Sequence, residues 1–213
     1  MGFEIMEHEV PITSNEEPTV SGYETVALKC GDDQLVAFYS LLQGGVTLRV
    51  TVGRTLRELL TDQLGIPGDY VTGRITTIFL NNSPLDDLDV VIGQGARVTL
   101  SAAMPGLVGA VMRRSGFYAA LREGITYAQQ GGDTRPATGT ITLKLFNLLL
   151  PELGPLILTR GILLEHKELE RLLAKLSALW IASSYPRERM AGGKVLLTVT
   201  FRDEAGRCRG GCR

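Results

Sequence analysis

The chain has 213 residues, 44% of them hydrophobic, so it is long enough to bury a core without support from a metal or a disulfide. Lys and Arg number 22 against 23 Asp and Glu, and the net charge of −1 excludes a general attraction to nucleic acid or an acidic membrane. Three cysteines are too few for a secreted disulfide framework, and the first residues lack a signal peptide's basic start and apolar core. We therefore expect a cytoplasmic protein without nucleic acid or membrane partners.

The first part of the chain predicts an extension followed by a hairpin. Residues 1–21 form the N-terminal extension, and strands are expected at 23–29 and 34–42 around a turn at 30–33. A tight glycine connection leads from the second of these strands into the next one, which places a hairpin directly before the first helix.

A strand and a capped helix come next. Residues 46–52 alternate between apolar and polar side chains, the period of two expected when a strand buries one face. Thr55 and Glu58 form a capping box, in which the hydroxyl accepts from an orphan amide and the carboxylate reaches back to the cap. The pattern therefore predicts a helix at 55–64, ended by Gly65.

Two more strands complete this part of the chain. They are expected at 75–80 and 97–102, with a turn at Asn81 and Asn82 after the first of them. Strand, helix, strand, turn and strand in this order indicate an α+β fold with a β-grasp module, followed here by a second, smaller α+β module.

Residues 34–109 resemble the small ubiquitin-like β-grasp sulfur carriers of thiamine and molybdopterin synthesis, in element order and in the positions of the turns. Two features depart from that family: its acidic turn is replaced at 93–95 by Gly-Gln-Gly, and its terminal Gly-Gly is replaced by Pro105 and Gly106 in a chain that continues. Carriers bear sulfur on a free terminal carboxylate, which Gly109 lacks. The resemblance therefore implies the fold but not the carrier chemistry at this site.

Beyond the third strand, the pattern predicts a helix at 107–122 with Gly116 as a weak point. Leu107, Val111 and Leu121 have helical spacing and are expected to pack against the module. The stretch 128–139 has almost no large apolar residue and is predicted to be a linker, so the β-grasp module with its trailing helix covers 22–127.

The second α+β module is placed at 140–205, before a flexible tail at 206–213. Strands are expected at 141–150 and 156–164, joined by a proline-rich turn, because Pro155 and charged residues exclude a membrane-spanning helix there. A helix with a leucine stripe from Leu169 to Trp180 and a strand at 195–201 complete this module.

Met104, Gly106, Arg113 and Arg114 are the candidate residues for binding a protein partner or an anion. A strand-to-helix turn followed by a basic pair resembles an anion site at a helix N-terminus, and both arginines are expected at the surface. The sequence contains no Walker loop and no dinucleotide fingerprint. An enzyme that binds a small anion is therefore one alternative function.

Arg209, Gly210 and Gly211 match the flexible Arg and Gly-Gly end of ubiquitin-like proteins. Such a tail can enter an adenylating enzyme, but Cys212 and Arg213 follow it and must first be removed by a protease. A sulfur carrier or ubiquitin-like modifier processed to Gly211 is thus another alternative, with an adenylating enzyme as partner.

No catalytic residue, metal site or cofactor is predicted. Cys208 and Cys212 are a loose pair, unlike the paired short spacings of structural zinc sites. His8 and His166 are not adjacent to a nucleophile motif, and His166 is expected to be solvated. The acidic residues of 86–89 are expected to form a solvated loop. The favoured function is a non-catalytic β-grasp scaffold that binds a protein partner or a second copy of itself.

Overall fold

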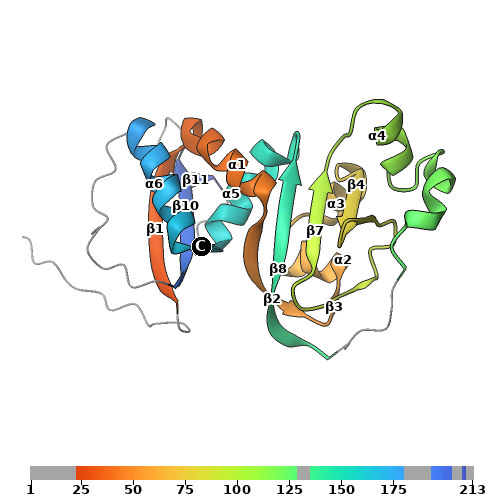
Figure 1. The fold of residues 1–213 in the computed structure, drawn as a ribbon, viewed down its shortest axis with the longest axis horizontal. Helices are drawn as coiled ribbons and strands as arrows, with labels where there is room; N and C mark the ends of the chain where they lie inside the picture. Colours follow the sequence, from red (N-terminus) through yellow and green to blue (C-terminus); the bar gives the residue numbers. More distant parts are fainter. Residues whose placement is uncertain (1–22, 129–134, 180–192, 203–207, 210–213) are drawn as a thin grey trace, which may run out of the picture.

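A nine-stranded mixed sheet forms the centre of the computed structural model, which describes residues 23–128, 135–179, 193–202 and 208–209 (Figure 1). The fold is α+β, as predicted. The sheet follows the order β1 (Glu24–Gly31), β10 (Lys194–Arg202), β9 (Ile162–Glu165), β2 (Val46–Val52), β8 (Ala137–Phe146), β7 (Arg97–Ser101), β4 (Thr77–Leu80) and β5 (Ser83–Pro84), and β11 (Cys208–Arg209) also pairs with β10. A separate ribbon consists of β3 (Arg54–Thr55) and β6 (Val91–Ile92).

The helical segments of the described chain lie on both halves of this sheet, the half with β1, β10 and β9 and the half with β8, β7, β4 and β5. They are η1 (Asp32–Phe38), α1 (Tyr39–Gly44), α2 (Leu56–Glu58), η2 (Leu59–Gln63), α3 (Gly68–Gly73), α4 (Gly106–Met112), η3 (Ala119–Ile125), α5 (Leu149–Arg160) and α6 (His166–Leu179). Figure 1 shows α5 and α6 beside β10, and α2 and α3 at the half that contains β4 and β7. β1 runs parallel to β10, and β7 runs parallel to β8. The buried side chains of both halves form one continuous hydrophobic cluster.

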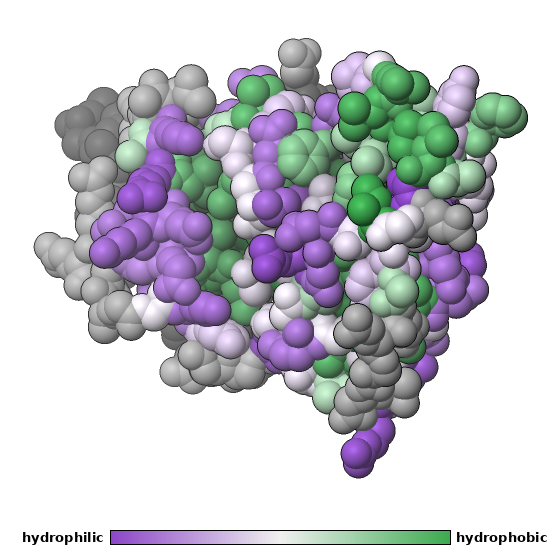
Figure 2. Space-filling model, turned by 45° about the vertical axis from the view of Figure 1, so that its right-hand side comes forward, coloured by the Kyte–Doolittle hydropathy of each residue, from purple (hydrophilic) through white to green (hydrophobic). Residues whose placement is uncertain are grey.

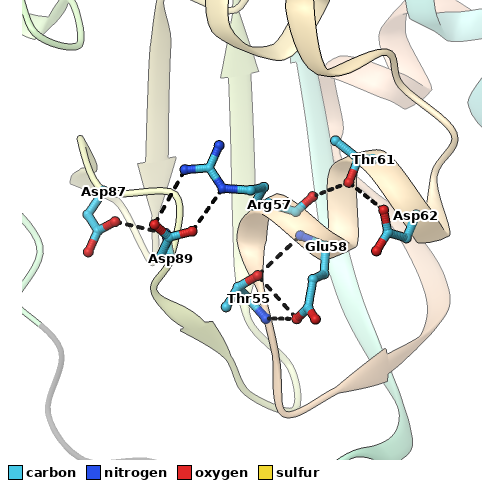
Figure 3. A network of polar contacts seen from close by, with 7 residues as sticks. All are labelled: Thr55, Arg57, Glu58, Thr61, Asp62, Asp87 and Asp89. Atoms are coloured by element: carbon cyan, nitrogen blue, oxygen red, sulfur yellow. Dashed lines mark hydrogen bonds and ion pairs between the residues drawn. The ribbon is translucent and has the colours of Figure 1, made fainter.

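The predicted strand at 46–52 and the capped helix after it are confirmed. Every second residue of β2 is buried. At the cap, the Glu58 amide donates to Thr55 Oγ1 at 3.2 Å, and the Thr55 amide donates to Glu58 Oε2 at 2.9 Å (Figure 3). The cap therefore satisfies two backbone donors where α2 begins, and it directs Leu56, Leu59 and Leu60 into the core.

The predicted strand at 34–42 is wrong, because η1 and α1 occupy these residues. The Gly31 amide donates to Gln34 Oε1 at 3.0 Å, so the chain turns into a helix directly after β1. Leu35, Phe38 and Leu42 are buried at a spacing of three and four residues, which is the helical period. The Phe38 ring packs edge-on against Phe201 of β10, with the ring centroids 5.7 Å apart.

The predicted strands at 141–150 and 156–164, with a turn between them, are wrong in part. β8 ends at Phe146, and α5 then runs through both prolines before β9 begins at Ile162. Pro151 lies in the first turn of α5, where its missing N–H leaves no hydrogen bond unmade. Most of α5 is buried, so its sequence shows the continuous apolar run that is also typical of a buried strand.

The pairing of β8 bears on the predicted linker and on the predicted boundary between two modules. Ala137 and Gly139, which belong to the predicted linker, pair with Val52 and Val50 of β2. β8 also pairs with β7 on its other side. The predicted boundary at 128–139 therefore does not separate two sheets, and residues 129–134 lie outside the described residues.

A polar cluster joins the two halves at their helices. The Tyr70 hydroxyl and the Arg74 guanidinium, at the end of α3, both donate to the carboxylate of Glu152 in α5. The hydrogen bonds from Arg74 are the largest cause of a lowered pKa of Glu152, and burial is the largest cause of a raised pKa of Tyr70. The cluster thus holds Glu152 ionised and fixes α3 to α5.

Candidate functional site

The chain leaves the sheet after β7 through a turn that contains two glycines with a structural role. Gly106 has a φ of +72°, a left-handed conformation that favours glycine, and it begins α4 after the N-cap Pro105. Gly109 is buried, and a Cβ there would collide with the main-chain carbonyl of Met104. These two glycines therefore allow the start of α4 to pack closely against Met104.

The predicted helix at 107–122 is interrupted. α4 ends at Met112, Ser115 has a φ of +52°, and the chain resumes as the 3₁₀ helix η3. The Arg114 amide donates to the carbonyl of Thr76 at 2.7 Å, which connects the break to the start of β4. The two short helices thus form a folded-back segment next to the sheet.

The buried side chain of Arg122 connects η3 to neighbouring parts of the protein. Its guanidinium donates to the carbonyl of Val111 at 2.8 Å, to Thr126 Oγ1 at 3.0 Å and to Asp86 Oδ1 at 2.7 Å. Only 1% of the Arg122 side chain is exposed. Burial of a guanidinium is costly unless its donors are satisfied, and here one residue connects α4, η3 and the loop before β6.

Arg114 is attached to the neighbouring helix. Its Nη2 donates to the carbonyls of Val71 at 2.9 Å and Thr72 at 3.3 Å, near the end of α3. Burial lowers the pKa of Arg114. The prediction that both arginines lie at the surface is therefore right for Arg113, which is exposed, and wrong for Arg114, which is half-buried.

The opposite side of the same segment is apolar and exposed. Phe117 is 92% exposed, Leu121 72% and Leu107 70%, and the Phe117 and Tyr118 rings contact each other edge-to-face at 5.1 Å. We define the α4–η3 face as the six exposed apolar residues Leu107, Val108, Phe117, Tyr118, Leu121 and Ile125. Figure 2 shows hydrophobic surface gathered at the upper right, where α4 lies. Large apolar side chains are thus exposed on a segment in which Arg122 is buried and Arg114 is half-buried.

The expectation that Leu107, Val111 and Leu121 pack against the module is wrong. Leu107 and Leu121 are largely exposed, and Val111 is half-buried. Their helical spacing assumed one continuous helix, whereas α4 ends at Met112 and Leu121 lies in η3. Spacing also cannot say whether an apolar face meets the protein's own core or the solvent, so sequence reasoning missed the exposed surface.

The other residues predicted to bind a partner or an anion lie in the turn before α4 and at the start of this helix. Met104 is half-buried and Gly106 exposed, and α4 has seven residues instead of the long helix expected. Arg114, the second member of the basic pair, donates to the carbonyls of α3 and not toward the turn at Gly106.

The predicted carrier tail is only partly described. Arg209 belongs to β11, where it is paired with Phe201 of β10. Gly210 and Gly211 lie outside the described residues, as does Cys212.

Among the residues that the structure describes, Cys30, Cys208 and His166 do not form a metal site. Cys30 is buried in β1, where burial raises the pKa of its thiol to about 11. β10 separates Cys30 from Cys208, and two strand spacings of about 4.8 Å exceed the reach of a disulfide. His166 is mostly buried, not solvated as predicted, with its Nε2 3.6 Å from Glu170. Within the described ranges, no group of three or more His, Cys, Asp or Glu residues could hold a metal ion.

The acidic loop has structural partners. Asp86 accepts from Arg122 and from the amide of Ser115. Figure 3 shows Asp89, which accepts from Arg57 at 2.9 Å. Asp87 accepts from the Asp89 amide at 2.8 Å. The loop is therefore held by a guanidinium at each end and offers no cluster of free carboxylates.

A depression of about 550 Å³ lies between the β4–β5 turn and the end of η3. Its lining is Asn81, Ser83, Gly124, Ile125, Thr126, Tyr127 and Ala128. None of these residues carries a carboxylate, an imidazole or a thiol. The hydroxyl groups of Ser83, Thr126 and Tyr127 thus have no carboxylate, imidazole or thiol beside them in this lining to activate them.

Comparisons of the chain with protein families, with curated proteins and with solved structures found no match. No helix in the part of the chain that the structure describes is long and apolar enough to cross a membrane. The class of protein must therefore be inferred from its fold and its surface, and the α4–η3 face is the strongest feature of that surface.

Proposed function

We propose that this protein is a non-catalytic β-grasp scaffold that binds another protein chain through the α4–η3 face. The observation that supports this function is the reversed polarity of the segment, with Arg122 buried and Phe117 almost fully exposed. A surface segment normally turns its apolar side chains inward. A contiguous exposed apolar patch on a folded protein is typical of a site where another chain binds.

The energetics favour the same function. Burying a large apolar side chain contributes about 1.5–3 kcal/mol, and the most exposed members of the face contribute little of this to the fold of the single chain. A second chain that covered them would recover that free energy. The buried hydrogen bonds of Arg114 and Arg122 hold the segment in place beforehand, so little ordering cost opposes binding.

The strand order supports a β-grasp scaffold in which one strand comes from a different part of the chain than usual. A β-grasp begins with a hairpin before its helix, and the antiparallel partner of β2 is here β8, from the far side of the predicted linker. We therefore infer that the first strand of the β-grasp is supplied by a later part of the chain. In this arrangement β7 cannot end in a free carrier tail, since the chain must return to the sheet as β8.

The carrier alternative then depends on the chain end. Arg209 pairs with β10, so a tail entering an adenylating enzyme would begin directly at the sheet. Intact mass of protein from its native cell tests this alternative. The full chain mass is expected, and loss of Cys212 and Arg213 would instead support processing to Gly211.

Site-specific photocrosslinking tests the proposed function. A photoreactive phenylalanine analogue is placed at position 117 of the full chain in its native cell, and at position 36 as a control. Val36 is also exposed, but it lies on η1. We expect a protein adduct from position 117 that position 36 does not form. If illumination yields no such adduct, the face does not bind protein and the proposal fails.

A further inference from the structure

We infer that the occupant of the α4–η3 face is the same face of a second copy of this chain, in a two-fold symmetric dimer. This inference rests on the proposed function and adds the identity of the partner. In a two-fold dimer the same patch contacts itself, so the patch must be complementary to its own chemistry. An apolar surface meets this condition.

The exposed area matches what such a dimer requires. From their exposed fractions, the six side chains present on the order of 700 Å² of surface, against about 800 Å² per partner in a standard interface. The largest apolar patch of a typical monomer is about 300–600 Å². The face alone can therefore supply most of one side of a stable interface.

The charges of the segment favour a second copy over a different protein. Three arginines occur in 106–122, and the guanidinium groups of Arg114 and Arg122 are bonded to the protein's own carbonyl and carboxylate oxygens. Arg113 is the exposed one. Interfaces between different proteins commonly use complementary charges, whereas homodimer interfaces are more apolar and have few charges at their centre. The apolar composition of the face is that of a homodimer interface.

The same charges argue against a membrane surface. Segments that lie on a membrane combine their apolar side with a polar side rich in Lys and Arg. Here the exposed positive charge of the α4–η3 segment comes from Arg113, among side chains that the structure describes. The segment therefore lacks the basic surface that would hold it at anionic lipid headgroups.

Sedimentation equilibrium of the purified full chain, from about 1 to 100 µM, tests the dimer. We expect a dimer in this range for the wild type. Phe117→Asp should raise the dimer dissociation constant by at least about tenfold, because it places a carboxylate in an apolar interface. Val36→Asp is the matched control and should leave the constant unchanged. Circular dichroism should show that both variants remain folded, as expected at such exposed positions.

Three outcomes would overturn the dimer. They are a wild type that stays monomeric over the whole range, equal weakening by both substitutions, and binding of the monomer to vesicles of phosphatidylcholine with phosphatidylglycerol. The photocrosslink at position 117 separates this failure from failure of the proposed function. An adduct of twice the chain mass supports the dimer, and an adduct of another mass retains protein binding with a different partner. If no adduct forms, both the dimer and the proposed function fail.

Discussion

Arg122 Nη2 and Asp86 Oδ1 lie 2.7 Å apart, and the arginine side chain is 1% exposed while the aspartate side chain is 37% exposed. The pair joins η3 to the loop before β6, directly beneath the α4–η3 face. The face is therefore held by a buried charge that is satisfied on all sides, and removal of that charge should release the segment.

Arg122→Met should lower the free energy of unfolding by about 2–4 kcal/mol, because it leaves the carbonyl of Val111 without this donor and Asp86 with only the amide of Ser115. Chemical denaturation measures this change. Arg113→Ala, at an exposed position of the same segment, is the control and should change stability by no more than about 0.5 kcal/mol. Equal effects of the two substitutions would contradict the anchoring role of Arg122.

Leu60→Ala should destabilise the fold by about 2–5 kcal/mol, since Leu60 is fully buried and its truncation leaves a cavity. Leu121→Ala is the matched control, because it removes the same atoms from a side chain that is 72% exposed. Its effect on the monomer should stay within about 0.5 kcal/mol. Denaturation of both variants at a concentration that gives monomers measures the difference. A mild Leu60→Ala would show that η2 does not face the core.

Thr55→Ala should cost about 1 kcal/mol, because the Glu58 amide loses its acceptor at the start of α2. Thr55→Ser retains the hydroxyl and should recover most of the loss. Denaturation midpoints of the two variants measure the cap. If serine and alanine destabilise equally, then the methyl group of Thr55, not its hydroxyl, is responsible.

Stability should fall in acid through Glu152, whose pKa is lowered chiefly by its hydrogen bonds from Arg74. A lowered pKa in the folded state means that the contribution is complete above the unfolded-state pKa, about 4.3, and is lost as the pH falls through the folded-state value. Glu152→Gln should therefore be less stable than the wild type at pH 7, and this difference should shrink below about pH 4. Urea denaturation across this range measures it, and a difference independent of pH would contradict the ionised Glu152.

Light proteolysis with a protease of broad specificity should cut the chain first between Gln129 and Arg135, where few apolar residues can be buried and which lies before the paired residues of β8. The two fragments should then stay together, because β8 lies between β2 and β7 in one sheet. Gel filtration of the nicked protein should give one species, and a denaturing gel should show two. Fragments that separate without denaturant would show that the two halves are independent.

The sequence by itself determined the elements whose signals are local. The alternation in β2, the capping box at Thr55 and Glu58, the turn at Asn81 and Asn82, and the leucine stripe of α6 each lie within a few residues. Both turn residues have a positive φ, which asparagine tolerates better than most residues. Such signals need no distant partner, since they arise from the backbone and from side chains one turn or two residues apart.

Only the tertiary structure decided the remaining features, because they depend on residues far apart in the chain. Apolar runs at 34–42 and 149–160 fit a buried strand or a buried helix equally well, and the packing of Phe38 on Phe201 and of α5 on β10 selects the helix. The place of β8 between β2 and β7 follows from pairings across more than thirty residues of sequence. The same holds for the α4–η3 face: its apolar side chains are exposed because the helix breaks after Met112 and because Arg114 and Arg122 make buried contacts with residues far away in the chain.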